Sequence, residues 1–424
     1  MSSLIDSDYV SESSLANLRL YKYASIDKSP FSKYILRPYW DRAVELFPMW
    51  MAPNLITLCG LGFILVNLVC VMVFLPDLVG PGAPWLYYST PDAKKLVYKP
   101  TKLSFLSIDT NNSFAAGLWL YQTFDNVDGR QARRTKSSSP LGELFDHGCD
   151  ALNCSFGAVV QAAAMGLGHS WYSAFLLLVT TLPFYLSTWE EYHTGILYLG
   201  YINGPTEGLV IACIIMILSG IFGPGIWLTD LRGLFGEGVP EFIPKGYHLV
   251  DVTVFFMAVG MIFIHTPASL YHVYKACSQR STSFLATLPQ LFSIVLYSLC
   301  GYLWLASPHS YIFRDQHFIL FALTTGVVFG RVATKIILAH VTKMPFPMYT
   351  VLLIPLLIGA LLTNIPVWLK TDTILTPTAE YYYLWGYFGF AVIAYTHWAN
   401  LVISRFCSYL GINCLTIPAS KKRI

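Results

Sequence analysis

Long apolar stretches recur along the whole chain, and they constrain its fold more than any other feature. Crossing a bilayer takes about 20 apolar residues in a helix, and several stretches reach that length. Of the 424 residues only 12% are charged, against about a quarter in soluble proteins. We therefore expect an all-α, polytopic integral membrane protein with about ten transmembrane helices. The expected spans are residues 53–75, 112–133, 143–168, 171–190, 206–223, 249–271, 285–306, 316–341, 346–368 and 382–409.

A stretch ahead of the first span has a different character. Residues 30–50 mix Trp, Tyr and Phe with charged side chains such as Lys33, Arg37 and Arg42. Aromatic and basic residues of this kind gather where a bilayer meets water. The stretch therefore predicts an amphipathic helix lying in the membrane interface.

The distribution of basic residues indicates how the chain is oriented. With ten spans, most of the Lys and Arg residues of the termini and the loops together fall on the side of the N-terminus, which predicts a cytosolic N-terminus and C-terminus. The chain ends with Lys421 and Lys422 followed by two residues, which resembles a dilysine retrieval signal. We therefore expect an endoplasmic reticulum membrane protein. Asn111 begins a glycosylation sequon on the predicted lumenal side.

Four aspartates, Asp125, Asp128, Asp146 and Asp150, lie within 26 residues beside these apolar stretches. Spacings of three and four residues place each pair on one face of a helix. Carboxylates suit hard cations such as Mg²⁺ or Mn²⁺ better than zinc. Two consecutive helices could thus hold a two-metal site at the cytosolic boundary, with the ions about 3.5–4 Å apart. Alternatively, the aspartates could pair with the nearby cations in a cytosolic loop, namely Arg130, Arg133, Arg134 and Lys136.

The same stretch carries a family resemblance. It follows the pattern DxxDGxxARx8GxxxDxxxD at every specified position, which is the signature of the CDP-alcohol phosphotransferase family. Residues 51–57 (MAPNLIT), 139–147 (SPLGELFDH) and 187–193 (STWEEYH) look like the eukaryotic choline/ethanolamine phosphotransferases, and the last looks particularly fungal. The chain thus resembles that branch of the family over nearly its whole length.

The resemblance implies an activity and several site residues. Phosphocholine or phosphoethanolamine would pass from CDP-choline or CDP-ethanolamine to diacylglycerol, with release of CMP. The four aspartates would hold two Mg²⁺ or Mn²⁺ ions, while Arg133 and Asn54 would hold the nucleotide diphosphate. Gly129 and Ala132 would leave space for the cytidine, and Gly142 lies beside the carboxylates in the same way. The family also suggests a homodimer, and nothing points to nucleic acid.

The lipid hydroxyl needs a proton acceptor, and two residues are candidates. His147 lies between the last two signature aspartates, and an imidazole titrates near neutral pH. Asp150 is the alternative, although a metal ligand is a weaker base. We favour His147. Glu143, four residues earlier on the same face, would orient its ring, and Glu207, at the start of the fifth span, would raise its basicity from across the bundle.

Other polar and aromatic residues leave questions open. Aromatic rings could enclose a quaternary ammonium, and Tyr121, Trp189 and Tyr192 are candidates, but the sequence does not decide between choline and ethanolamine. Glu190 and Glu191 could support the site or form a solvated rim.

The resemblance divides the chain into four parts. These are a cytosolic N-terminus with the interfacial helix (1–50), the catalytic helices (51–223), the C-terminal transmembrane helices (224–410) and a cytosolic tail (411–424). Two other functions remain to be weighed. A phosphatidylinositol or phosphatidylserine synthase would use CDP-diacylglycerol, but such enzymes are usually shorter. A cation-coupled transporter could use buried aspartates, but it would not need the accompanying glycines, alanine and arginine.

Overall fold

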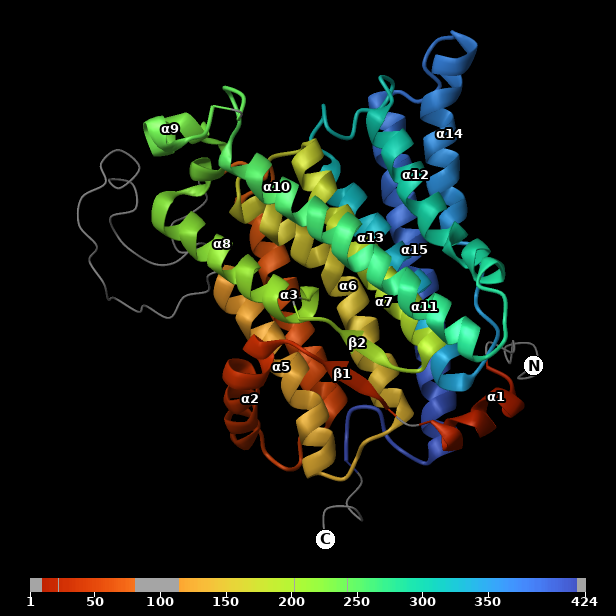
Figure 1. The fold of residues 1–424 in the computed structure, drawn as a ribbon. Coiled ribbons are helices and arrows are strands. Elements are labelled where there is room, and N and C mark those ends of the chain that lie inside the picture. Colours follow the sequence, from red (N-terminus) through yellow and green to blue (C-terminus); the bar gives the residue numbers. More distant parts are fainter. Residues whose placement is uncertain (1–9, 22, 81–113, 202, 242, 418–424) are drawn as a thin grey trace.

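The computed structural model describes residues 10–21, 23–80, 114–201, 203–241 and 243–417. Helices dominate this part of the chain and form one bundle (Figure 1). The longer helices are α3 (Pro53–Phe74), α5 (Phe114–Arg134), α6 (Pro140–Ala164), α7 (Trp171–Thr194), α8 (Leu209–Phe222), α10 (Leu249–Val259), α11 (Thr266–Gln279), α12 (Phe292–Ala306), α13 (Phe318–Thr342), α14 (Leu353–Leu369) and α15 (Pro377–Leu410).

Short elements connect or extend these helices. Three of them, η2, η5 and η8, are π-helical turns, and the other η elements are 3₁₀ turns. The short elements are α1 (Glu12–Ala16), η1 (Asn17–Leu20), β1 (Ser25–Asp27), η2 (Ser32–Leu36), α2 (Arg37–Ala43), η3 (Val44–Leu46), β2 (Leu197–Leu199), η5 (Gly204–Gly208), η6 (Pro224–Leu228), α9 (Leu231–Phe235), η7 (Gly236–Gly238), η8 (Gly260–His265) and η9 (Leu285–Leu291).

Each of the ten expected spans falls on a helix. Within the described residues, six helical stretches are long and apolar enough to cross a membrane, so the protein is a multi-pass membrane protein. They are Pro53–Phe74, Trp171–Thr194, Gly204–Phe222, Leu249–Gln279, Leu285–Ala306 and Phe318–Thr342. The helices α5, α6, α14 and α15 are not among the six, and ten spans therefore stay a prediction.

The predicted start of the ninth span is wrong. We expected a helix from residue 346, but α14 begins at Leu353, and residues 344–350 have no regular structure. Pro345 and Pro347 explain the difference, because proline lacks an N–H donor and disfavours helical backbone in the residue before it. Lys343, which has a φ of +55°, ends the preceding helix.

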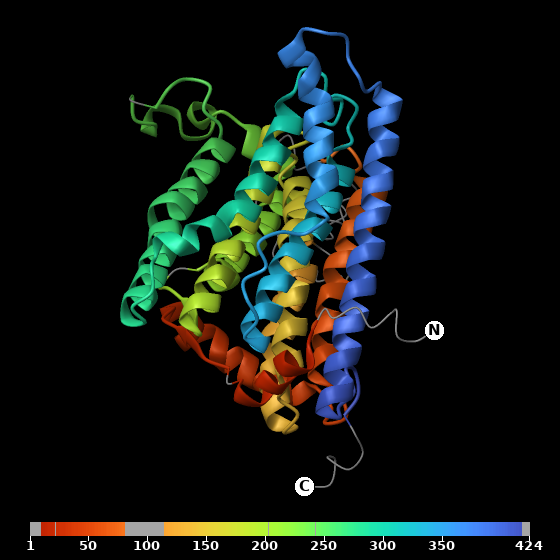
Figure 2. The ribbon, with the colours of Figure 1, turned by 90° about the vertical axis from the view of Figure 1, so that its right-hand side faces the viewer.

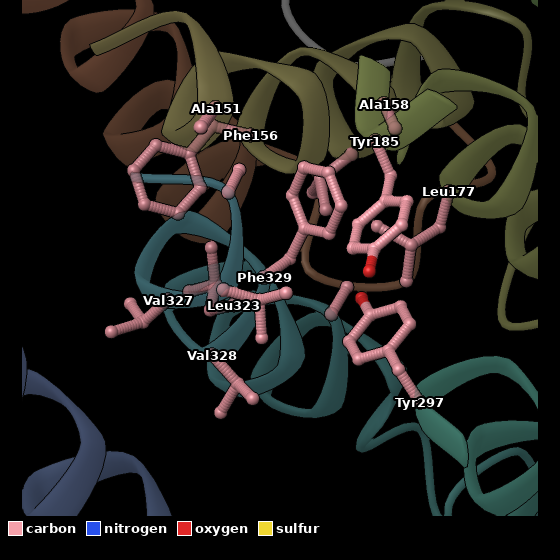
Figure 3. Packing of buried hydrophobic residues seen from close by; sticks show 14 of the residues in the cluster. Ala151, Phe156, Ala158, Leu177, Tyr185, Tyr297, Leu323, Val327, Val328 and Phe329 are labelled. Atoms are coloured by element: carbon pink, nitrogen blue, oxygen red, sulfur yellow. The ribbon is translucent and has the colours of Figure 1, made fainter. Parts of the chain in front are cut away.

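The helix α13 is the centre of the bundle. Of an 18-residue apolar stretch in α13, 94% is buried, against 11% of the corresponding stretch in Leu249–Gln279. Figure 3 shows its side chains, including Val327 and Phe329, packed between residues of α6, α7 and α12. Glycines allow α13 to approach α6 closely: a Cβ on Gly326 would lie 2.5 Å from the Cβ of Ser155. The close contact fixes α6, which carries half of the predicted site.

The expected interfacial helix is present as a helix, although its interfacial position stays a prediction. The turns and helix from Ser32 to Leu46 lie at one end of the bundle, with α9 at the opposite end (Figures 1 and 2). One side packs on α5, where Leu36, Trp40 and Ala43 bury Val127. The opposite side exposes aromatic and aliphatic side chains, among them Tyr34, as an interfacial helix requires.

The residues before this helix form a segment that we call the N-terminal strap, residues 10–21 and 23–29. Ser25 to Asp27 pair in parallel with Leu197 to Leu199, which follow α7 (Figure 1). The Asn17 amide donates to the Thr342 carbonyl at the end of α13 (2.9 Å). The strap therefore joins elements that are far apart in sequence, at the same end of the bundle as the turn between α5 and α6.

Candidate active site

The turn between α5 and α6 positions the signature aspartates. As expected, α5 ends at Arg134 and α6 begins at Pro140. The Ser139 hydroxyl accepts a hydrogen bond from the Gly142 N–H (3.3 Å), and Pro140 occupies the first turn, where its missing N–H costs nothing. The two helices thus return on each other with their acidic faces adjacent.

The four aspartates converge. Asp125, Asp146 and Asp150 each bring a carboxylate oxygen to within 4.8 Å of the others. Asp128, which is buried, accepts a hydrogen bond from the Thr57 hydroxyl on α3. Buried oxygens of Asp125 and Asp146 have no hydrogen-bond partner within the described residues. Carboxylates gathered so closely repel one another unless a cation or protons neutralise them, and this all-oxygen donor set fits Mg²⁺ or Mn²⁺.

Two of the four nearby cations, Arg130 and Arg134, have partners elsewhere. Arg130 pairs with Asp41 (2.7 Å), and Arg134 donates to the carbonyls of Val44 and Phe47 (2.8 Å each). Both arginines instead hold α2 and η3 against α5. The contacts of Arg130 and Arg134 therefore do not support the alternative in which nearby cations neutralise the aspartates.

The residues predicted to bind the nucleotide lie around the same carboxylates. The Asn54 side-chain oxygen lies 3.8 Å from the position that a Cβ on Gly142 would take, and its amide donates to the Cys414 sulfur (3.7 Å). A Cβ on Gly129 would lie 3.8 Å from an Arg133 guanidinium nitrogen. Ala132, three residues after Gly129, shares its helix face.

A second group contains His147. Glu143, His147 and Glu191 each bring one ligand atom to within 4.8 Å of the others. His340 of α13 extends the group, with its Nε2 3.9 Å from Glu143. The proposed proton acceptor is therefore flanked by two carboxylates, one from its own helix and one from α7.

Glu191 was the partner that the sequence left undecided. It is buried at the end of α7 (4% exposed) and does not belong to a solvated rim. Its neighbour Glu190 is also buried and pairs with His272 (2.7 Å). In the sequence, the signal for Glu191 was a pair of acidic residues at the end of an apolar span. Burial of such residues depends on which side of the helix faces the bundle, and the sequence does not give this.

Glu207 has partners of its own. It accepts hydrogen bonds from the Ser29 hydroxyl and from the Asn203 N–H (3.0 Å). The structure thus groups Glu191 with His147, while Glu207 fastens the N-terminal strap to the start of α8. The expected effect of Glu207 on His147 stays a prediction.

The chain is similar in sequence to known proteins. Residues 50–232 match the CDP-alcohol phosphatidyltransferase family. Choline/ethanolaminephosphotransferase 1 of Arabidopsis thaliana is 34% identical over 96% of this chain and 98% of its own length. The Saccharomyces cerevisiae protein of the same name is 34% identical over 97% of this chain and 99% of its own length. Human ethanolaminephosphotransferase 1 is 29% identical over 96% and 94%.

The chain belongs to the CDP-alcohol phosphatidyltransferase family. Its similarity to choline/ethanolaminephosphotransferases extends over nearly the full length of both chains. The signature aspartates, Glu143, His147 and Glu191 all fall within the matched residues.

Proposed function

We propose that this protein is a choline/ethanolaminephosphotransferase. It transfers phosphocholine or phosphoethanolamine from a CDP-alcohol to diacylglycerol and releases CMP. The observation that carries the proposal is the convergence of the signature carboxylates with the group around His147, in a chain that aligns end to end with relatives of that name. A shorter synthase that uses CDP-diacylglycerol fits that alignment less well.

His147 is proposed to accept the proton of the diacylglycerol hydroxyl. The freed oxygen forms a bond to the β-phosphorus, the bond from that phosphorus to the CMP oxygen breaks, and CMP leaves. Glu143 and Glu191 orient the imidazole and stabilise its positive charge once it holds the proton. Asp150, whose carboxylate accepts a hydrogen bond from Tyr121, is the alternative proton acceptor.

The four signature aspartates are proposed to hold two Mg²⁺ or Mn²⁺ ions. Such ions neutralise a diphosphate and stabilise the leaving oxygen. Asn54 and Arg133 orient the nucleotide diphosphate, while Gly129, Ala132 and Gly142 keep the surrounding helix faces free of bulky side chains.

The location follows from the predicted topology. We propose ten spans, a site that opens to the cytosol, where CDP-alcohols are found, an endoplasmic reticulum membrane and a homodimer. The turn that positions the site lies at the same end of the bundle as the N-terminal strap and the C-terminal end of α15 (Figures 1 and 2). The dilysine residues Lys421 and Lys422, and Asn111 of the sequon, lie outside the described residues.

Purified protein in detergent or liposomes tests the proposal. With Mg²⁺ and diacylglycerol, CDP-choline and CDP-ethanolamine should release CMP and yield phospholipid, and a competition between the two gives the preference. Asp146→Asn should abolish the reaction. CMP release from CDP-diacylglycerol with inositol or serine would instead indicate a synthase. Cation movement across liposomes without CMP release would indicate a transporter.

A further inference from the structure

The three aromatic residues named as candidates for the substrate's ammonium group direct their polar atoms to partners inside the bundle. Tyr121 donates its hydroxyl to Asp150. Trp189 is fully buried, and its indole N–H donates to a glutamine of η9 (2.9 Å). Tyr192 donates to a backbone carbonyl after α13 (3.0 Å). A substrate that arrives from the cytosol would first meet a ring that lies nearer the surface.

The N-terminal strap holds such a ring. Tyr23 lies two residues before Ser25, whose strand pairs with Leu197. Leu197 follows the end of α7, where Glu191 lies. On the other side, the Asn17 amide is bound to the end of α13. The strap is thus fixed on both sides of Tyr23, to helices that contribute to the group around His147.

The strand pairing and the Asn17 hydrogen bond place Tyr23 beside the ends of α7 and α13, and the electrostatics of its phenol agree with that position. Loss of hydration raises the pKa of its phenol to about 12, and the negative charges of Asp146, Glu191 and Asp125 contribute to the increase. The residue nevertheless keeps 54% of its surface exposed. Tyr23 therefore lies at the boundary between solvent and the carboxylates.

We propose that Tyr23 is a substrate-contacting residue whose ring packs against the ammonium group of the bound CDP-alcohol. This assignment rests on the proposed function. The ammonium group is the one cationic part of either substrate, and a cation is attracted to the face of an aromatic ring. The metal ions would neutralise the aspartates, whereas Glu143 and Glu191 would keep negative charge on this side of the site.

Steady-state kinetics of Tyr23 variants test the assignment. Loss of a cation–π contact predicts that Tyr23→Leu raises KM for CDP-choline by about tenfold, with kcat largely retained. Tyr23→Trp keeps an aromatic face and should stay near the wild type. Inhibition by CMP, which lacks the ammonium group, should be unchanged. Tyr34→Leu, an exposed tyrosine also ahead of the first span, is the matched control.

Three results would overturn the assignment. One is an unchanged KM in Tyr23→Leu, and another is an equal rise of KM in Tyr23→Trp. The third is a weaker inhibition by CMP in Tyr23→Leu, which would place the ring against the nucleotide. Tyr23→Gln provides a second variant without a ring if Tyr23→Leu is unstable. Absence of CMP release by the wild type would overturn the proposed function itself, and so differs from these results.

Discussion

Thr57 offers a direct test of how the acidic site is built. Its hydroxyl donates to Asp128, and the residue is 2% exposed, so water has no room to replace the lost donor. Hydrogen bonds to charged groups contribute about 1.5–3 kcal/mol, or about 10- to 150-fold in an equilibrium. Substitution of a group that supports a metal ligand typically weakens metal binding by about 10- to 100-fold.

Thr57→Val should therefore raise the Mg²⁺ concentration for half-maximal activity by about 10- to 100-fold. The substitution keeps the shape of the side chain, so kcat at saturating Mg²⁺ should be largely preserved. The assay is CMP release from CDP-choline over a Mg²⁺ titration. Thr57→Ser, which keeps the hydroxyl, should behave as the wild type.

Thr324→Val is the matched control, because this buried hydroxyl of α13 bonds to a carbonyl of its own helix (2.7 Å). It should leave the Mg²⁺ titration unchanged. If Thr57→Val also leaves the titration unchanged, Asp128 does not hold a metal ion through this support. A fall in kcat alone would assign Thr57 to another step.

Three further predictions concern the rest of the site and the bundle. Glu191→Gln should lower kcat by about tenfold or more, because the proton acceptor loses a carboxylate neighbour, whereas a normal kcat would remove Glu191 from the mechanism. Ser29→Ala and Glu207→Ala should cause similar, non-additive losses of activity, since both remove the hydrogen bond between these two residues. An inactive Glu207→Ala beside a normal Ser29→Ala would instead link Glu207 to the proton acceptor. Gly359→Ala should destabilise the protein by about 1–3 kcal/mol or more, because its Cβ would lie 2.2 Å from the tryptophan of α12. The measurement is the thermal midpoint in detergent, which should fall. An unchanged midpoint would show that this contact relaxes freely.

The sequence predicts the helices well because crossing a membrane imposes a length and an apolar composition. Each of the ten expected spans overlaps a helix of the described residues. The error at α14 has a local cause: residues 344–350 are apolar enough to continue a span, but Pro345 and Pro347 prevent a helix there. An average of hydrophobicity does not register this backbone effect.

The site was predictable where helical spacing determines it and unpredictable where packing does. Asp125 and Asp146 come together because one short turn joins their helices. Glu191 and Glu207 both precede or follow spans at the predicted cytosolic side, and only the packing of α7 brings Glu191 to His147. Tyr23 lies outside every span, and its position depends on a strand pairing of three residues, which is too short to give a sequence pattern.

The N-terminal strap has a consequence for the order in which the protein forms. Its contacts join residues that are very far apart in the chain: Asn17 and Thr342 are separated by 325 positions, and Glu12 and Arg405 by 393. During synthesis the strap leaves the ribosome first, but its partners on α13 and α15 are translated last. The strap can pair with β2 and Glu207 soon after α5 and α6 are made, but its attachment to α13 and α15 has to wait for the last helices. A nascent chain therefore holds both acidic helices long before the strap is fastened at its two ends.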